Sequence, residues 1–192
     1  MPILGVLASA ITGNLAVPDT GAMFQLGMVS VGSGGTANIT FSSIPSTYKH
    51  LQIRGIARTN RALTRDALKV TVNGNTDSSY GYHNLYGNGT SATAQGFGSE
   101  PNIPFNDIAG NTATANVFGV MIIDILDYAS TTKVKTLRGL GGYDNDGSGV
   151  VGLNSGAYFG NTNALTSIKL ESYGGTAFQQ YTTFALYGIK GA

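Results

Sequence analysis

Few residues of this chain have the types and spacing that catalysis requires. Gly147, Gly149 and Gly152 match a G-x-G-x-x-G pattern. A dinucleotide site needs a strand before this motif and a helix after it, and here a strand-like run follows. Asp144 and Asp146 look like the start of a calcium loop, but the later oxygen ligands and the closing glutamate are missing. Both motifs therefore predict turns.

The other residues that could act in catalysis are sparse. The chain has no cysteine, and neither His50 nor His83 has metal-ligand spacing to another histidine. Asp124 and Asp127 lie three positions apart, so on one strand they point to opposite faces and cannot form a glycosidase pair. We therefore predict a protein that is not an enzyme, with no catalytic residues, no metal and no cofactor.

One aromatic cluster could bind a ligand. Tyr80, Tyr82 and Tyr86 share one face of a predicted strand, and His83 lies beside them. Such rings could stack against a sugar of a host-surface glycan or contact a partner. The other interpretation is an aromatic stripe of the core.

A second cluster is basic. Six of the eleven lysines and arginines fall within residues 49–69, where Asp66 alone opposes them. The segment lacks interleaved aromatics for stacking on bases, so nucleic acid is not an expected partner. A solvated face, a subunit interface and a site for an anionic ligand remain open. The residues that would form such an interface are Arg54, Arg58, Arg61 and Arg65.

The segments that must position these residues are short β-strands. Ten runs of β-branched and aromatic residues alternate with turns rich in Gly, Asn, Ser and Asp, without an amphipathic helical segment. The pattern predicts an all-β protein, an antiparallel β-sandwich of jelly-roll type. Alternation on both sides of the turn at 32–35 predicts a hairpin over 26–41. The aperiodic stretch 87–114 predicts one long, partner-facing loop.

The most apolar run covers residues 117–126. Because side chains of a strand alternate between its faces, this run predicts a central strand covered on both sides. Asp124 interrupts the run, and a buried carboxylate needs a partner. We expect that partner to be Arg54, Arg138 or Lys135.

The composition favours an assembling protein. A chain of 192 residues fits one domain and needs no disulfide. Only 11% of its residues are charged, against about 25% in an average soluble domain. A surface with so little charge suits packing against neighbours. The formal charge of +1 gives no attraction to nucleic acid or to an anionic membrane.

The first residues predict a docking arm. Residues 1–23 precede a sandwich domain at 24–192, and their apolar run at 3–7 is too short for a secretory core or a membrane span. We expect the arm to dock onto a particle, with a signal peptide or a disordered tail as the alternatives. Its docking residues would be Ile3, Leu4, Val6, Leu7 and Ile11.

Several segments carry a resemblance across most of the chain. They are Met-Pro-Ile-Leu-Gly-Val-Leu-Ala-Ser at 1–9, Val-Gly-Ser-Gly-Gly at 31–35, Ile-Thr-Phe-Ser-Ser-Ile-Pro-Ser-Thr-Tyr-Lys-His-Leu-Gln-Ile-Arg at 39–54, Val-Asn-Gly-Asn at 72–75, Ile-Asp-Ile-Leu-Asp-Tyr at 123–128 with 133–138, and Phe-Ala-Leu-Tyr-Gly-Ile-Lys-Gly at 184–191. They resemble a family of small β-rich structural proteins of tailed bacteriophages. The resemblance implies a virion component and carries no catalytic residues across.

We therefore expect a virion protein, made in the host cytoplasm, whose partners are other virion subunits. The first hypothesis for its role is a tail fibre or other tail-attached protein that docks through its arm. The alternatives are a capsid decoration (cement) protein and a carbohydrate-binding module for receptor recognition. A homo-oligomer is expected, with a trimer favoured.

Overall fold

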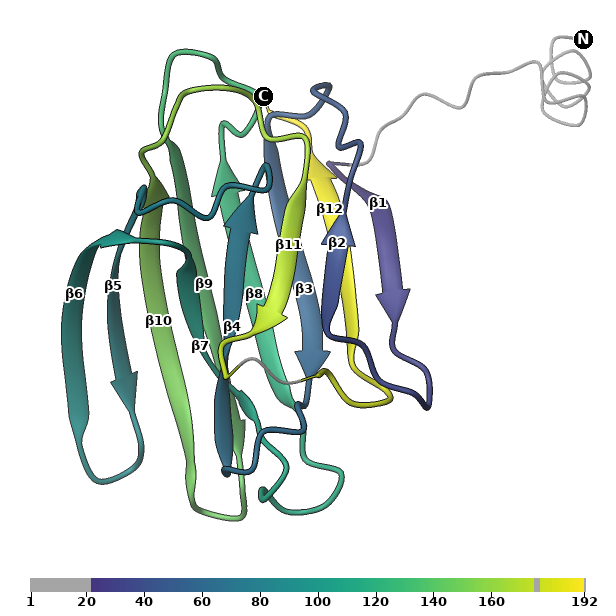
Figure 1. The fold of residues 1–192 in the computed structure, drawn as a ribbon, viewed down its shortest axis with the longest axis vertical. Coiled ribbons are helices and arrows are strands. Elements are labelled where there is room, and N and C mark those ends of the chain that lie inside the picture. Colours follow the sequence, from purple (N-terminus) through teal and green to yellow (C-terminus); the bar gives the residue numbers. More distant parts are fainter. Residues whose placement is uncertain (1–21, 175–176, 192) are drawn as a thin grey trace, which may run out of the picture.

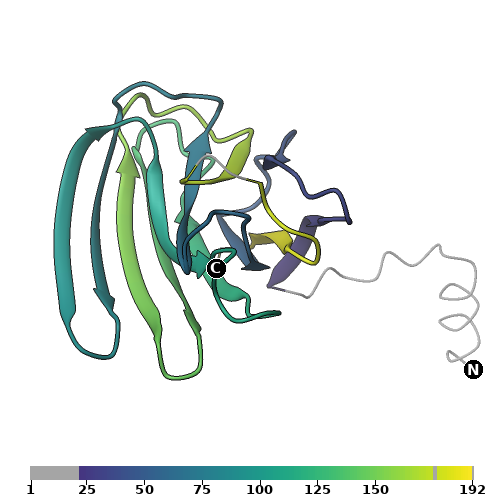
Figure 2. The ribbon, with the colours of Figure 1, turned by 60° about the horizontal axis from the view of Figure 1, so that its bottom comes forward.

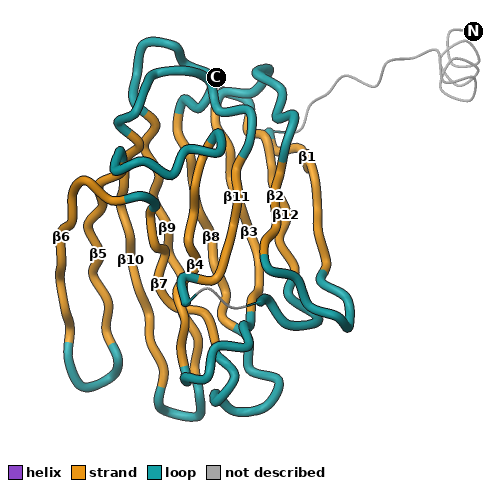
Figure 3. Tube along the Cα trace, in the orientation of Figure 1, coloured by secondary structure: helices purple, strands orange, loops and turns teal. Residues whose placement is uncertain are grey.

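Twelve β-strands make up most of the part of the chain that the structure describes, residues 22–174 and 177–191. In this computed structural model they form two antiparallel sheets, with no helix among the described residues (Figures 1 and 3). The expected all-β, antiparallel fold is confirmed.

The two sheets differ in width. From edge to edge, the eight-stranded sheet consists of β1 (Met23–Ser30), β12 (Thr183–Ile189), β3 (His50–Ala57), β8 (Gly119–Leu126), β9 (Lys135–Asp144), β10 (Gly149–Tyr158), β5 (Tyr80–Gly87) and β6 (Ala92–Glu100). The four-stranded sheet consists of β2 (Asn38–Phe41), β11 (Ile168–Ser172), β4 (Arg65–Val72) and β7 (Ile103–Ala109).

The chain passes repeatedly from one sheet to the other. β2, β4, β7 and β11 belong to the small sheet, and the segments β3, β5–β6 and β8–β10 between them belong to the large sheet. β1 and β12 pair at one edge of the large sheet, and β6 forms the opposite edge (Figures 1 and 2).

The core lies between the sheets because each strand turns alternate apolar residues inward. Ile123 and Leu137 of the large sheet share one cluster with Leu68 and Phe105 of the small sheet, and none is more than 1% exposed. Each such side chain contributes about 1.5–3 kcal/mol through its burial. Gly139 lets the Phe105 ring approach β9, because a Cβ at this position would lie 2.3 Å from the ring.

The hairpin predicted over 26–41 does not form. β1 pairs with β12 and β2 pairs with β11, so the two strands lie in different sheets. The turn between them crosses from sheet to sheet. Gly35 has φ +68°, and a Cβ there would lie 2.8 Å from the carbonyl oxygen of Phe178. The alternation of each strand reflects one buried face and does not specify which strand it pairs with.

The single loop predicted at 87–114 is also wrong, because this stretch contains β6 and β7. Small residues at every second position of β6, and Pro104 within β7, weaken the strand signal. β7 lies against β9 and β10, so it belongs to the packed domain.

The predicted docking residues lie outside the described residues. They are Ile3, Leu4, Val6, Leu7 and Ile11.

Candidate functional site

The outer face of the large sheet carries a continuous apolar surface that no part of the described chain covers. Strand register places Ile122 beside Leu140, Leu140 beside Leu153 and Leu153 beside Leu85. A second row begins with Ile56 beside Val120. We call this surface the outer apolar belt. Its side chains, each 37–60% exposed, are Ile56, Leu85, Val120, Ile122, Leu140, Val151 and Leu153.

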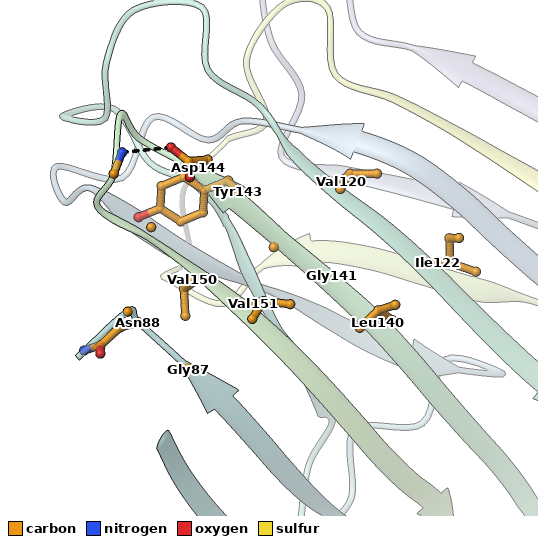
Figure 4. Close-up of a pocket in the computed structure, with 14 residues that line it drawn as sticks. Gly87, Asn88, Val120, Ile122, Leu140, Gly141, Tyr143, Asp144, Val150 and Val151 are labelled. Carbon is orange, nitrogen blue, oxygen red and sulfur yellow. Dashed lines mark hydrogen bonds between the residues drawn. The ribbon is translucent and has the colours of Figure 1, made fainter. Parts of the chain in front are cut away.

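The belt is hollowed beside the turn between β9 and β10. A concavity of about 550 Å³ is lined by Val120, Ile122, Leu140 and Val151, as Figure 4 shows. The turn at its rim is an ordinary hairpin tip in which the Gly147 N–H donates a hydrogen bond to the Asp144 carboxylate at 3.0 Å. The G-x-G-x-x-G match is therefore a turn, as predicted.

Two of the charged groups beside the belt, Asp124 and Arg138, neutralise each other. The Asp124 carboxylate accepts a hydrogen bond from Gln52 Nε2 at 2.7 Å and lies 3.6 Å from Arg138 Nη2. This confirms Arg138 as one of the partners expected for Asp124. Lys135 is instead buried, and its ammonium group donates to backbone carbonyls, including that of Lys133. The outer face thus combines an apolar belt with one internal ion pair and the exposed guanidinium of Arg54, which lies opposite Ile122.

Strand β6 forms an exposed edge next to the belt. All six residues from 94 to 99 are exposed, and Glu100 at the end of the strand is its only charged residue. Its residues on the outer face are small, with Ala94 opposite Leu85 and Gly96 opposite His83. Natural edge strands usually carry lysine, proline or other charge that discourages pairing with another chain. This edge has none of those along most of its length.

The predicted aromatic ligand surface does not exist as one surface. Tyr80 and Tyr82 are buried, with the Tyr80 ring 5.0 Å from Tyr158 and the Tyr82 ring 5.0 Å from Phe97. His83 is exposed on the opposite face of β5, because side chains alternate along a strand.

The remaining member of that cluster, Tyr86, is half-buried beneath the Arg65 guanidinium, 5.2 Å from the ring centre. The core-stripe interpretation is therefore right for Tyr80 and Tyr82.

The predicted basic interface is likewise dispersed. Arg54 is exposed and donates to Gln52, whereas Arg58 is buried. Its guanidinium donates four hydrogen bonds, of 2.8–3.1 Å, to backbone carbonyls between residues 111 and 117. Arg61 pairs with Asp66 at 3.1 Å. Arg65 lies near Arg61 and 3.8 Å from Asp107, so each of these two is next to a carboxylate, and the four arginines do not form one basic surface.

Comparison with known proteins gives no match to any family model, curated protein or solved structure. Within residues 22–174 and 177–191, no helix is long and apolar enough to cross a membrane. In the same residues, no three histidine, cysteine or acidic side chains gather as metal ligands.

Sequence reasoning identified most strands of the belt but missed the belt itself. The run at 117–126 gave one clue, because it is apolar at positions that point to both faces. In the structure one of those faces meets the core and the other, with Val120 and Ile122, is exposed. The full row depends on the register of five strands, which the sequence does not state.

Proposed function

We propose that this chain is a non-enzymatic structural subunit of a tailed-phage virion, a tail fibre or other tail-attached protein, that assembles with copies of itself. The observation that carries the proposal is the outer apolar belt beside the unprotected edge of β6. Isolated exposed apolar residues are common, but a contiguous patch on this scale is typical of a protein interface.

The occupant we propose for the belt is a second copy of this chain. The charges of the face are few, and its Asp124–Arg138 pair is internal, so the only like charge that an identical subunit would bring to it is the exposed Arg54 among the described residues. The adjacent edge of β6 offers unpaired backbone groups to the same neighbour. If the belt of one subunit meets the edge region of the next, the contact is head-to-tail, and such a contact forms a ring when its rotation closes. We propose a trimer as that ring.

We further propose that the sandwich is of jelly-roll type. A jelly roll folds an eight-stranded double Greek key into two sheets. When β8–β10 counts as one unit, the chain from β2 to β11 consists of eight units. The small sheet then holds the first, last, third and sixth units, and the large sheet holds the second, seventh, fourth and fifth. This order supports a jelly roll in which a three-stranded meander replaces one strand.

The distribution of the phage-like segments supports the tail-attached interpretation. Residues 39–54, 123–128 and 184–191 contribute to β2, β3, β8 and β12, in the part of the molecule near β1, whereas 72–75 and 133–138 contribute to β4 and β9. The stretch 87–114, which resembles the family least, supplies the distant edge strand β6. A shared docking half and a divergent far edge suit a protein that is anchored at one end.

Sedimentation equilibrium of the purified full chain tests the assembly. We expect a mass that is a multiple of 19.8 kDa, with a trimer favoured. Leu153→Lys should reduce it to 19.8 kDa because it places a charge in the middle of the belt. The matched control is Leu63→Lys, since Leu63 is 50% exposed in a loop outside the belt, and it should leave the mass unchanged. A monomeric parent protein, or an unchanged mass for Leu153→Lys, would contradict the proposal.

Copy number per particle then separates the two positions in a virion. A tail-attached protein is present in few copies, and a decoration protein covers the capsid in many. Quantitative staining of purified particles measures this number, and a capsid-like copy number would replace the tail interpretation with the decoration one.

A further inference from the structure

A small polar pocket lies on the other side of the large sheet, away from the outer apolar belt. It has a volume of about 220 Å³ and opens between edge strand β7 of the small sheet and the inward side of the β5–β6 hairpin. Asn84 and Tyr82 of β5 face Asp107 of β7 across it, and Tyr173 lies at its margin. It shares no residue with the belt, although Gln95 and Phe97 of its lining belong to β6.

Two buried carboxylates beside this pocket differ sharply in their hydrogen bonding. Asp66 accepts bonds from the Thr59 hydroxyl at 2.9 Å, the Ala67 N–H at 2.8 Å and the Arg61 guanidinium at 3.1 Å. Asp107 is equally buried but lies 3.8 Å from Arg65 through Oδ1. Its Oδ2 has no hydrogen-bond partner among the described residues.

Asn84 supplies a second unsatisfied acceptor. Its side chain is 8% exposed, and its Oδ1 has no hydrogen-bond partner in the described part of the chain. A buried polar atom without a hydrogen-bond partner destabilises the folded state. Two such acceptors in one pocket, Asn84 Oδ1 and Asp107 Oδ2, indicate that a ligand with hydrogen-bond donors belongs there.

The backbone holds Asp107 in this position at a local cost. The pairing of β4 with β7 shifts by one residue between Asp66 and Ala67, which leaves Asp107 as an extra residue of a β-bulge. Its φ is +113°, a conformation that non-glycine residues rarely adopt. Bulges re-aim side chains, and strained residues of this kind concentrate at functional sites. Burial raises the pKa of Asp107 to about 6, although the positive charge of Arg65 opposes the rise.

Aromatic rings form the apolar part of the pocket. Tyr82 stacks on Phe97 with the ring planes 28° apart, and Phe97 remains 41% exposed. Tyr173 is 52% exposed. The pocket thus combines buried acceptors with accessible ring surface, an arrangement suited to a molecule that is hydroxylated along its edge and apolar on its face.

We propose that this pocket binds a single neutral sugar residue, whose hydroxyl groups donate hydrogen bonds to Asp107 Oδ2 and Asn84 Oδ1. The C–H face of the sugar ring packs against Phe97 and Tyr173. The pocket size matches one ring and excludes a larger branched ligand from its interior. Tyr82 and Tyr86 of the expected aromatic surface line this pocket, but the accessible rings offered to the sugar are Phe97 and Tyr173.

The charges of the pocket favour a neutral ligand over an ionic one. Arg61 and Arg65 balance Asp66 and Asp107, so the lining has no net charge. A cation would have to approach the Arg65 guanidinium, which lies 3.8 Å from Asp107. An anion would have to approach the unpaired Asp107 oxygen. Hydroxyl groups satisfy both acceptors without either repulsion.

Saturation-transfer NMR with the full chain tests the site. The probes are the methyl glycosides of glucose, galactose, mannose and N-acetylglucosamine, with tetramethylammonium and inorganic phosphate as ionic comparisons. We expect at least one glycoside to bind and neither ion to do so. Asp107→Asn should weaken that binding at least ~10-fold, because a charged acceptor is lost. The matched control Asp146→Asn, an exposed carboxylate in the β9–β10 turn, should bind as the parent does.

A second variant covers the case in which Asp107→Asn does not fold. Tyr173→Ala removes an exposed ring that takes no part in the core, and it should weaken glycoside binding severalfold while the circular dichroism spectrum stays unchanged. Absence of binding by every glycoside, unaltered affinity in both pocket variants, or binding of an ion alone would each overturn the proposal.

Discussion

The two faces of the eight-stranded sheet are built from similar residues but meet different surroundings. Inward-pointing Ile123 and Leu137 are fully buried against the small sheet. Their neighbours Ile122 and Leu140, which point outward, are also large and aliphatic, yet they are 37% and 54% exposed. An antiparallel sheet with one wet face normally shows polar residues there. The large sheet therefore has two apolar faces, of which the small sheet buries only one.

The largest expected effect separates the two faces by stability. Leu137→Ala should lower the free energy of unfolding by about 2–5 kcal/mol, because it leaves a cavity in the core. Leu140→Ala should change it by no more than about 0.5 kcal/mol in a monomeric Leu153→Lys background, because nothing covers Leu140 there. Urea unfolding at equal protein concentration measures both. Equal losses would mean that the outer face is buried within a single chain, and the comparison would fail.

A smaller effect, on the pH dependence of stability, tests Asp107 of β7, in the small sheet that packs against the inward face. The pKa of Asp107 is raised to about 6 from an ordinary 3.8, so between pH 4 and 6 the folded state binds more protons than the unfolded state. Stability should therefore fall by about 2–3 kcal/mol as pH rises from 4 to 7.

The matched variant for this pH dependence is Asp107→Asn, whose stability should not show the decrease between pH 4 and 7 that the Asp107 carboxyl causes. The pKa of Asp127 is lowered to about 2 by hydrogen bonds from Lys133 and Lys49. Asp127 therefore affects stability only below about pH 4 and does not disturb this window. If the free energy of unfolding changes with pH in parallel for the parent and for Asp107→Asn, the pKa of Asp107 is not raised by burial and this prediction is wrong.

Sequence patterns were sufficient to predict the fold class and most strands. The alternation in residues 48–58 and 68–72 reports one buried face in each strand, and both segments are strands of the structure. Which strands pair with one another was harder to predict from the sequence. The short link at 32–35 predicted a hairpin. In the structure β1 and β2 belong to different sheets, so this link passes from one sheet to the other.

The two candidate sites were harder to predict because each depends on contacts between distant segments. Ile103 and Phe105 alternate, and the next buried isoleucine is at 108 rather than 107. This break in the period marks the bulge that presents Asp107, but it resembles loop sequence when β7 is not recognised. Tyr80 and Tyr82 were correctly grouped on one face, yet only the sheet opposite them determines that this face is the core.

Hydrogen–deuterium exchange of β6 tests the central claim, that a second copy covers the outer belt and its edge, most directly. We predict that amides of residues 92–100 exchange at least ~10-fold more slowly in the assembled parent protein than in monomeric Leu153→Lys, because pairing and burial protect them. Amides of β8, in the middle of the sheet, should exchange similarly in both. Identical exchange of β6 in the two proteins would contradict the account.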